Sequence, residues 1–386
     1  MSHNSGRHIA WHQRLAPVRI TRAWARARFF SALRAAGRTD DGRSIAREAI
    51  DDLAAWRLQL PARATSVRPP YPELGRASAE DVAALRQPVF ISARFRSGST
   101  LLWNLFRHVD GCTSYYEPLN ERRWFDPAHR GERVDTTHLH VEDYWREYDG
   151  LDELAAYYRE EWINRRLYMD ERSWDPDLAA YIRTMVRRAE GRPVLQFNRV
   201  DFRLPWLRHT FPTARIVHLY RNPRDQWFSS LWKWKCPLSC TAAEFAQHDH
   251  FYLLSWAEDL KHRFPFLDPS TAEHPYRVFY YLWKLSFWFG AAYAHHSVSF
   301  EELTSNPRRE IERLFHAVGI EGADYQRLET LVEATPSRWQ KYAPDDWFRA
   351  HEEACENVLR DFFGIASSTG HAESPLRAVR SGVGRA

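Results

Sequence analysis

Five consecutive residues, Arg96 to Thr100, combine a cation, a glycine and three hydroxyl groups. They stand between an apolar, β-branched run at 89–93, which predicts a buried strand, and an apolar pattern at helical spacing over 101–109. A loop in this position points backbone N–H groups and the helix dipole toward an anion. The segment is therefore a candidate phosphate loop, and the structural alternative is a Ser/Gly turn that caps a helix.

The segment departs from the phosphate loop of ATPases, GxxxxGK[ST]. Gly98 and Thr100 match the second glycine and the final hydroxyl residue, but Ala93 replaces the first glycine and Ser99 replaces the lysine. Without that lysine the loop lacks its usual contact with the β- and γ-phosphates of ATP. The cation here is Arg96, so the pattern argues against a P-loop kinase that acts on ATP.

A second candidate anion site follows the strand predicted at 216–220. Arg221 ends this strand, and Ser229 comes eight residues later, about two turns into a helix predicted at 223–235. An arginine at the end of a strand and a hydroxyl on the next helix can share one anion. The alternative for Arg221 is a surface charge, and we interpret Arg224 and Asp225 as a solvated helix start.

A carboxylate ends another predicted strand, over 113–117. In open α/β sheets the ligand crevice lies outside the carboxyl ends of the strands, so Glu117 should face the same crevice as the phosphate loop. The alternative is a structural ion pair with one of many arginines. A competing base, His108, lies on the helix that leaves the loop, roughly 13 Å from its start at 1.5 Å per residue.

The overall charge gives no reason to expect a nucleic-acid partner. The 386 residues hold 54 Lys and Arg against 50 Asp and Glu, a formal net charge of +4. Eight arginines and no acid fall within residues 1–39. We expect a packed helical extension there. A basic helix on a membrane surface and a matrix-targeting peptide remain as alternatives.

Neither a metal site nor a membrane span is expected. The four cysteines form neither a disulfide framework nor a zinc-ligand pattern. The longest run without Asp, Glu, Lys or Arg, over 285–300, has 16 residues, short of the roughly 20 that a span needs. No signal peptide is visible, so we expect a cytoplasmic protein.

Short strand patterns alternate with longer helical patterns through the main body of the chain. Further strands are predicted at 194–197 and 298–300, and further helices at 151–168, 177–190, 276–295, 307–318 and 344–363. This alternation predicts an α/β fold, a P-loop-like parallel sheet with helices on both faces. The expected division is a basic, mainly helical N-terminal extension with a Pro-rich linker over 1–86, the main domain over 87–366, and a flexible tail over 367–386.

Taken together, these segments resemble the sulfotransferases that use 3′-phosphoadenosine 5′-phosphosulfate (PAPS). The loop Arg96–Thr100 is similar to the Arg-led 5′-phosphosulfate loop of carbohydrate and protein sulfotransferases, and Arg221 with Ser229 resembles the family's 3′-phosphate motif. The resemblance covers roughly residues 87–365. It extends to weaker landmarks, namely Tyr116-Glu117-Pro118-Leu119, Phe300-Glu301-Glu302-Leu303 before Asn306-Pro307, and Ser337-Arg338-Trp339.

The sequence departs from that family in two respects. Phe95 replaces the proline that often precedes the loop cation. The Golgi members carry an N-terminal membrane anchor, which is not visible here, and this favours a soluble enzyme of bacterial type.

The resemblance implies in-line transfer of a sulfuryl group from PAPS to an acceptor hydroxyl, without a metal. Arg96, Ser97, Gly98, Ser99 and Thr100 would bind the phosphosulfate, with Arg96 also neutralising the leaving phosphate. Arg221 and Ser229 would bind the 3′-phosphate, and Glu117 would act as general base. Alternatives are a P-loop nucleotide kinase and a non-catalytic binding protein of the same fold. The acceptor stays open among small-molecule, glycan and lipid hydroxyls, and so does the oligomeric state.

Overall fold

A computed structural model describes residues 87–131, 133–231 and 234–365, together with the isolated positions 28, 31 and 35. Contacts within the chain divide it into two units, Met1–Tyr71 and Pro72–Ala386, and every element described below belongs to the second unit. The predicted N-terminal extension and C-terminal tail lie outside the described residues, so that part of the expected division stays a prediction.

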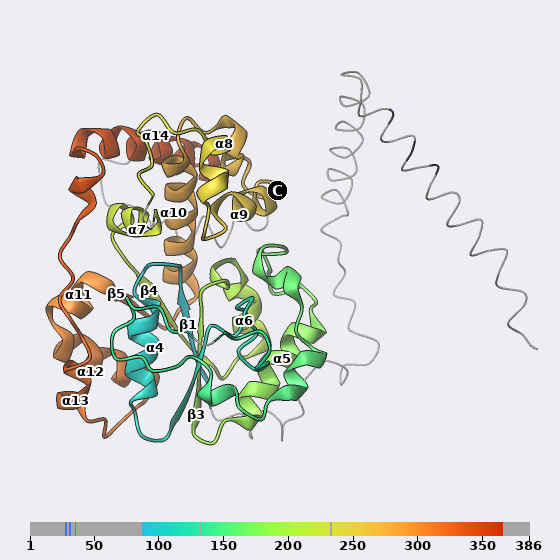
Figure 1. Cartoon of the computed structure of the whole chain (residues 1–386), viewed down its shortest axis with the longest axis vertical. Helices are drawn as coiled ribbons and strands as arrows, with labels where there is room; N and C mark the ends of the chain where they lie inside the picture. Colours follow the sequence, from blue (N-terminus) through green and yellow to red (C-terminus); the bar gives the residue numbers. More distant parts are fainter. Residues whose placement is uncertain are drawn as a thin grey trace, which may run out of the picture. The chain divides into compact units, whose positions relative to one another are not determined.

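A five-stranded sheet organises the described part of the chain (Figure 1). All neighbouring strands run parallel, in the order β2-β3-β1-β4-β5. The strands are β1 Val89–Ala93, β2 Cys112–Tyr116, β3 Arg192–Phe197, β4 Arg215–Tyr220 and β5 His296–Ser299. The predicted parallel α/β sheet is therefore confirmed, and every strand ends at the same edge.

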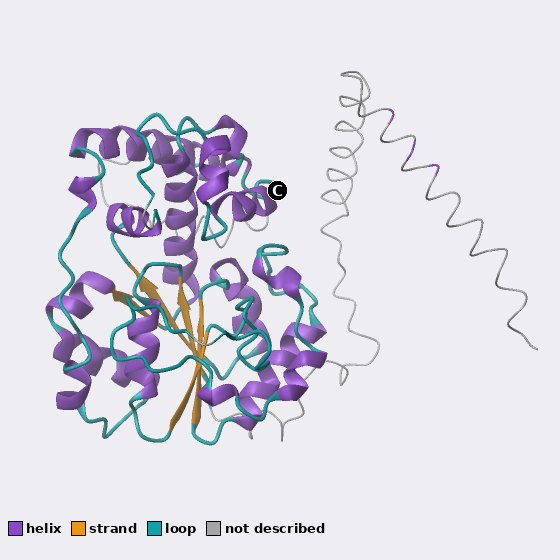
Figure 2. Ribbon diagram, viewed as in Figure 1, coloured by secondary structure: helices purple, strands orange, loops and turns teal. Residues whose placement is uncertain are grey.

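Helices cover both faces of this sheet (Figures 1 and 2). The α-helices are α4 Ser99–Arg107, α5 Pro176–Arg188, α6 Leu204–Thr210, α7 Pro223–Ser230, α8 Ala242–Phe245, α9 Leu253–Leu260, α10 Pro275–Tyr293, α11 Phe300–Ser305, α12 Pro307–Val318, α13 Tyr325–Glu329 and α14 Asp345–Phe363. Short 3₁₀ turns connect them: η2 Arg146–Tyr148, η3 Asp152–Ala156, η4 Glu160–Ile163, η5 Asp201–Arg203, η6 Ala246–His248, η7 Pro265–Leu267, η8 Pro269–Thr271 and η9 Trp339–Lys341.

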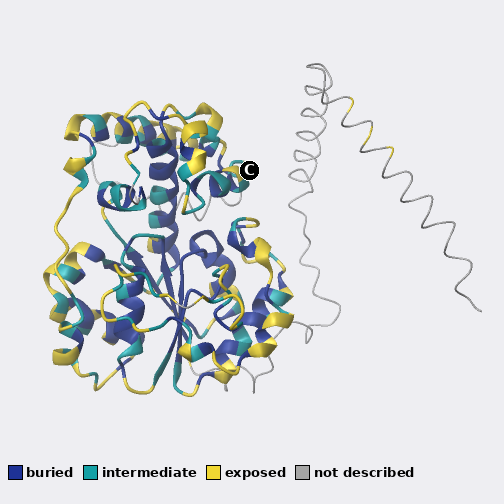
Figure 3. Ribbon diagram, in the orientation of Figure 1, coloured by how far each residue is buried: buried dark blue, intermediate teal, exposed yellow. Residues whose placement is uncertain are grey.

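The alternation of side chains along β1 feeds two separate cores. Val89 and Ile91 pack with apolar residues of α4, α11 and α12 on one face. Phe90 points to the other face, where α5, α6 and α10 build a larger and more aromatic core. Buried residues accordingly line the sheet and α10 (Figure 3). The aromatic residues of α10 are mostly buried, so they belong to the core.

One predicted helix is wrong. The apolar spacing over 151–168 is helical, but the structure forms only the short turns η3 and η4 there. Over 162–167 the reason is long-range hydrogen bonding. The buried guanidinium of Arg203 donates to the carbonyls of Trp162, Arg165 and Arg166, and Asp259 accepts from the N–H groups of Arg166 and Leu167. These side chains satisfy the backbone in place of a helical ladder.

No helix in the described ranges is both long enough and apolar enough to cross a bilayer. The uncharged run over 285–300 instead comprises the end of α10, the short β5 and the first residue of α11.

Candidate active site

The loop between β1 and α4 contains two residues with a left-handed backbone. Gly98 has φ 96°, in the left-handed region, and a Cβ there would collide with the ring of Phe300. Arg96 also has a positive φ of 63°. A non-glycine residue in this conformation is strained and persists where surrounding structure enforces it, often at functional sites.

Hydrogen bonds join this loop to the segment after β4. The Nε of Arg96 donates to Oγ of Ser229 at 3.0 Å, and Arg221 donates to the carbonyl of Arg96 at 3.2 Å. The side-chain amide of Gln226, on α7, donates to the carbonyl of Phe95 at 2.7 Å. The structure thus brings together the two segments that the sequence proposes for two phosphate groups.

Arg221 has an unsatisfied donor at this junction. Its guanidinium lies over the ring of Phe300, 4.6 Å from the centroid, and its carbonyl accepts from the indole of Trp283 at 2.9 Å. Its Nε is buried with no hydrogen-bond partner among the described residues. A buried donor without a partner is costly, so this atom is suited to receive an anionic oxygen.

The electrostatics of both arginines also favour an anion. Burial lowers the pKa of Arg96 and of Arg221, and the nearby carboxylates only partly oppose that effect. A desolvated guanidinium gains most from a strong acceptor such as a phosphate.

The hydroxyls of the loop have different surroundings. Oγ of Ser97 donates to the carbonyl of Arg94 at 2.7 Å and closes the turn. Ser99 and Thr100 open α4, which has no acidic side chain in its first turn. Oγ1 of Thr100 lies 3.0 Å from the hydroxyl of Tyr116 and 3.3 Å from Nε2 of His138.

Glu117 directly follows β2 and is buried at the same edge of the sheet. Its φ is 39°, so Glu117 is, after Arg96, a second non-glycine residue of the site with a strained backbone. Its Oε2 accepts from Nδ2 of Asn120 at 2.6 Å and lies 3.8 Å from Nη1 of Arg199. Burial raises the pKa of Glu117, while Arg199 and the hydrogen bond from Asn120 oppose that rise. A raised pKa suits a carboxylate that must accept a proton.

Two residues of this site are not singled out by the sequence patterns. Arg199 is almost fully buried, and it also donates to Glu121 at 2.6 Å. It stands two residues after β3, so the rule that identified Arg221, a cation at the carboxyl end of a strand, could have found it. His138 lies in an irregular segment, where no sequence signal places it beside Thr100.

The helix start at Arg224 and Asp225 is not solvated, contrary to expectation. Arg224 donates to Glu352 at 2.8 and 2.7 Å. Asp225 is buried and accepts from Oγ of Ser337 and from the backbone N–H groups of Arg338 and Trp339. The polar pair therefore ties α7 to the C-terminal part of the domain.

His108 lies at the far end of α4, as its sequence position predicts. Its Nδ1 is 2.8 Å from the carbonyl of Asn104, one turn before the end of the helix and remote from the loop at the helix start.

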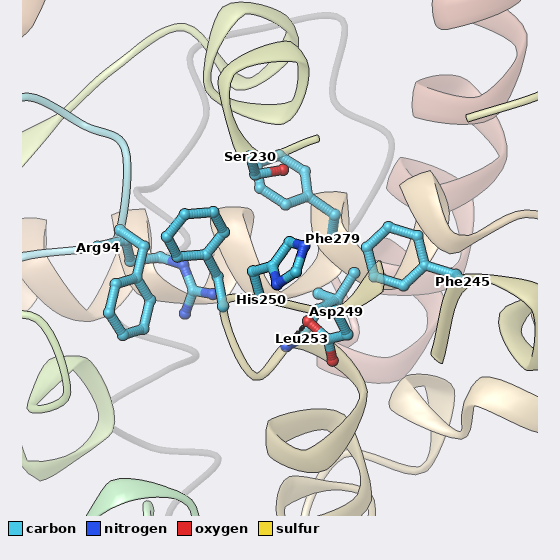
Figure 4. A pocket seen from close by; sticks show the side chains of 9 residues that line it. Arg94, Ser230, Phe245, Asp249, His250, Leu253 and Phe279 are labelled. Atoms are coloured by element: carbon cyan, nitrogen blue, oxygen red, sulfur yellow. Dashed lines mark hydrogen bonds between the residues drawn. The ribbon is translucent and has the colours of Figure 1, made fainter. Parts of the chain in front are cut away.

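A small cavity lies behind the loop (Figure 4). Its volume is about 20 Å³, and it is lined mainly by apolar side chains such as Phe245 and Phe279. The Arg94 guanidinium at its wall is 3.5 Å from Asp201. This space fits about one water, so it is too small for an acceptor. Elsewhere in the described ranges, no group of three His, Cys, Asp or Glu side chains could hold a metal ion.

Comparisons with known proteins bear on the same part of the chain. Similar solved structures include a sulfotransferase from Mycobacterium avium, with 12% identity, TM-score 0.41 and coverage of 75% of this chain and 79% of that one. They also include a sulfotransferase from Alicyclobacillus acidocaldarius, with 17% identity, TM-score 0.34 and coverage of 71% and 94%. No curated protein sequence matches. The model of the sulfotransferase family matches residues 88–324, which include the loop, Glu117, Arg221 and Ser229. The chain therefore belongs to the sulfotransferase family.

Proposed function

We propose that this sulfotransferase uses PAPS as donor and transfers its sulfuryl group to an acceptor hydroxyl. The observation that carries the proposal is the junction of Arg96, Ser229 and Arg221, where a buried guanidinium N–H has no partner among the described residues. Phosphate oxygens are strong acceptors for such donors.

The residues present fit the two charged ends of PAPS. Arg221 and Ser229 would bind the 3′-phosphate. Arg96, with the N–H groups and hydroxyls at the start of α4, would bind the phosphosulfate; Gly98 allows the close approach, and Ser97 shapes the loop. PAPS itself supplies the sulfuryl group and a leaving phosphate. No metal is needed in this proposal, because Arg96 neutralises charge on the departing side.

Glu117 would act as general base. Its carboxylate would accept the proton of the acceptor hydroxyl, a role typically worth about 10²–10⁴-fold in rate. Arg199 and Asn120 favour the ionised form of this buried group, because both oppose the effect of burial on its pKa. The acceptor class stays that of a small-molecule, glycan or lipid hydroxyl, and we expect the enzyme to act in the cytoplasm.

Calorimetric titration tests the donor. We expect adenosine 3′,5′-bisphosphate to bind more tightly than adenosine 5′-monophosphate or ATP. Arg221→Ala should remove most of that preference, about ten- to hundredfold, because hydrogen bonds to charged groups are worth roughly 1.5–3 kcal/mol.

Arg215→Ala is the matched control, since Arg215 is an exposed arginine at the opposite end of the same strand. Equal binding of the two adenosine nucleotides by the wild type would refute the 3′-phosphate site. Tighter binding of ATP would favour the kinase alternative. Nucleotide binding without any sulfuryl transfer to a panel of hydroxyl acceptors would favour a non-catalytic binding protein.

A further inference from the structure

His138 is held beside the phosphate loop by contacts with the first helix. The segment that carries it is fastened to α4: Nδ2 of Asn104 donates to the carbonyl of His140 at 3.1 Å, and Arg107 donates to Asp143 at 2.7 Å. The imidazole bridges two hydroxyls, with Nε2 3.3 Å from Oγ1 of Thr100 and Nδ1 2.5 Å from the hydroxyl of Tyr144.

The partners of Tyr144 fix the tautomer of His138. The Tyr144 oxygen accepts from the backbone N–H of Asp135 at 2.9 Å. Among the described residues Nδ1 of His138 is the one acceptor within hydrogen-bond distance of the Tyr144 hydroxyl, so we assign the hydroxyl hydrogen to Nδ1. A neutral imidazole that accepts at Nδ1 carries its hydrogen on Nε2. Burial lowers the pKa of His138 to about 4; the charge of Arg96 acts in the same direction, whereas Asp135 opposes it. The ring is therefore neutral at neutral pH.

The same logic continues through the loop to the carboxylate. Thr100 then accepts from His138, and we assign its own hydrogen to the Tyr116 oxygen, 3.0 Å away. The hydroxyl of Tyr116 lies close enough to Glu117 to lower the pKa of that carboxyl, and since a carboxylate can only accept, we assign the Tyr116 hydrogen to Glu117. Burial holds the pKa of Tyr116 well above its ordinary value, so this hydroxyl keeps its proton. With these assignments the three hydrogen bonds from Tyr144 to Tyr116 run in one direction, toward Glu117.

We propose that His138 is a positioning residue that keeps the Thr100 hydroxyl in the role of a donor. In this structure the hydroxyl faces Tyr116, and in the complex it would face an anionic oxygen of the nucleotide. Because the N–H of His138 occupies one lone pair of the Thr100 oxygen, the hydrogen of the Thr100 hydroxyl stays directed away from His138. This hydrogen is then available to donate to the anion. This inference rests on the proposed function, because it takes the loop to bind an anion.

Titration with adenosine 3′,5′-bisphosphate tests the role of His138. His138→Leu, which removes the donor, should weaken binding about tenfold, and His138→Gln, which keeps an N–H group, should restore most of the affinity. In a Thr100→Val background His138→Leu should add no further loss, because the two residues act through one hydroxyl. His140→Leu is the control, since this nearby side chain is exposed.

Additive losses, unchanged binding in His138→Leu, or an equal loss in His138→Gln would overturn the inference. A second measurement needs no nucleotide. The ¹⁵N shifts of the His138 ring at pH 7 should report the Nε2–H tautomer, and an Nδ1–H tautomer or an imidazolium would overturn the inference. If the wild type shows no preference for the 3′-phosphate, the proposed function fails. The ¹⁵N shifts of the His138 ring still test, independently, whether Nε2–H donates to Thr100.

Discussion

Glu117 combines a strained backbone, burial and an opposing cation. Because its pKa is raised in the folded protein, the ionised form makes folding less favourable near neutral pH. The stability that this group contributes is present at low pH and is lost as the pH rises through the folded pKa. A group kept in such a state at a cost to stability is characteristic of a functional site.

Replacement of this carboxylate should separate activity from stability. Glu117→Gln should lower turnover about 10²-fold or more, keep nucleotide affinity within a few-fold, and leave the melting temperature unchanged or higher. Arg199 keeps Glu121 as a partner in this variant. Glu121→Gln is the control, and it should retain turnover. Full activity in Glu117→Gln would assign the base to another residue.

The pH profile should respond to Asn120. The hydrogen bond from its side chain stabilises the charged form of Glu117 and so lowers the pKa. Asn120→Ala should therefore raise that pKa, and the acid limb of kcat/KM should move to higher pH while the plateau above it changes little. An acid limb that stays in place would mean that another group limits the rate at low pH.

At the scale of elements, α7 is the link between the phosphate loop and the C-terminal helices. Asp225 holds the segment 337–339 through one hydroxyl and two backbone N–H groups. Arg338 in that segment is close enough to lower the pKa of Arg221. The weak sequence landmark at 337–339 therefore lies beside the proposed 3′-phosphate site.

Asp225→Ala should loosen this link. Since hydrogen bonds to charged groups are worth roughly 1.5–3 kcal/mol each and are not additive, we expect a loss of about 2–4 kcal/mol in the free energy of unfolding. Asp225→Asn keeps an acceptor and should lose less. Urea denaturation measures both variants, and equal stability of the wild type and Asp225→Ala would show that the segment is held by other contacts.

The packing of α10 on β4 depends on one small residue. A Cβ at Gly290 would collide with the buried ring of His218. Gly290→Ala should therefore cost about 1–3 kcal/mol of stability, whereas Ala291→Ser, at an exposed position of the same helix, should cost little. The stability losses of Gly290→Ala and His218→Ala, measured by thermal unfolding, should be less than additive in the double variant. Additive losses would show that the two residues do not contact each other.

On the scale of the whole molecule, both phosphate segments lie within the part that matches the family, residues 88–324. We expect a truncated chain that begins near residue 80 to fold and to bind adenosine 3′,5′-bisphosphate like the full chain. Circular dichroism and titration would measure this. Loss of folding on truncation would mean that the N-terminal segment belongs to the core.

The sequence predicts the parts of this molecule whose signals are local. The strands at 89–93 and 216–220 are apolar apart from Ser92 and His218. Arg96 and Arg221 follow these strands at the edge where the parallel strands end, as the sequence predicts, and their roles stay a proposal. The helix predicted over 151–168 is wrong because the deciding contacts are not local. Arg203 and Asp259, both distant in the sequence, hydrogen-bond the backbone over 162–167. The sequence does not identify His138 for the same reason, because only tertiary contacts bring it to Thr100.

The strand order also sets when the site can come into existence. In the sheet, β1 lies between β3 and β4, and Val89 pairs with Val194 and Arg215. The phosphate loop therefore has no framework until more than a hundred further residues have been synthesised. Such long-range pairing slows folding and leaves an apolar strand exposed in the meantime. During synthesis the phosphate loop is translated before the strands that hold it in place. Until those strands are made, the exposed apolar strand could be bound by chaperones.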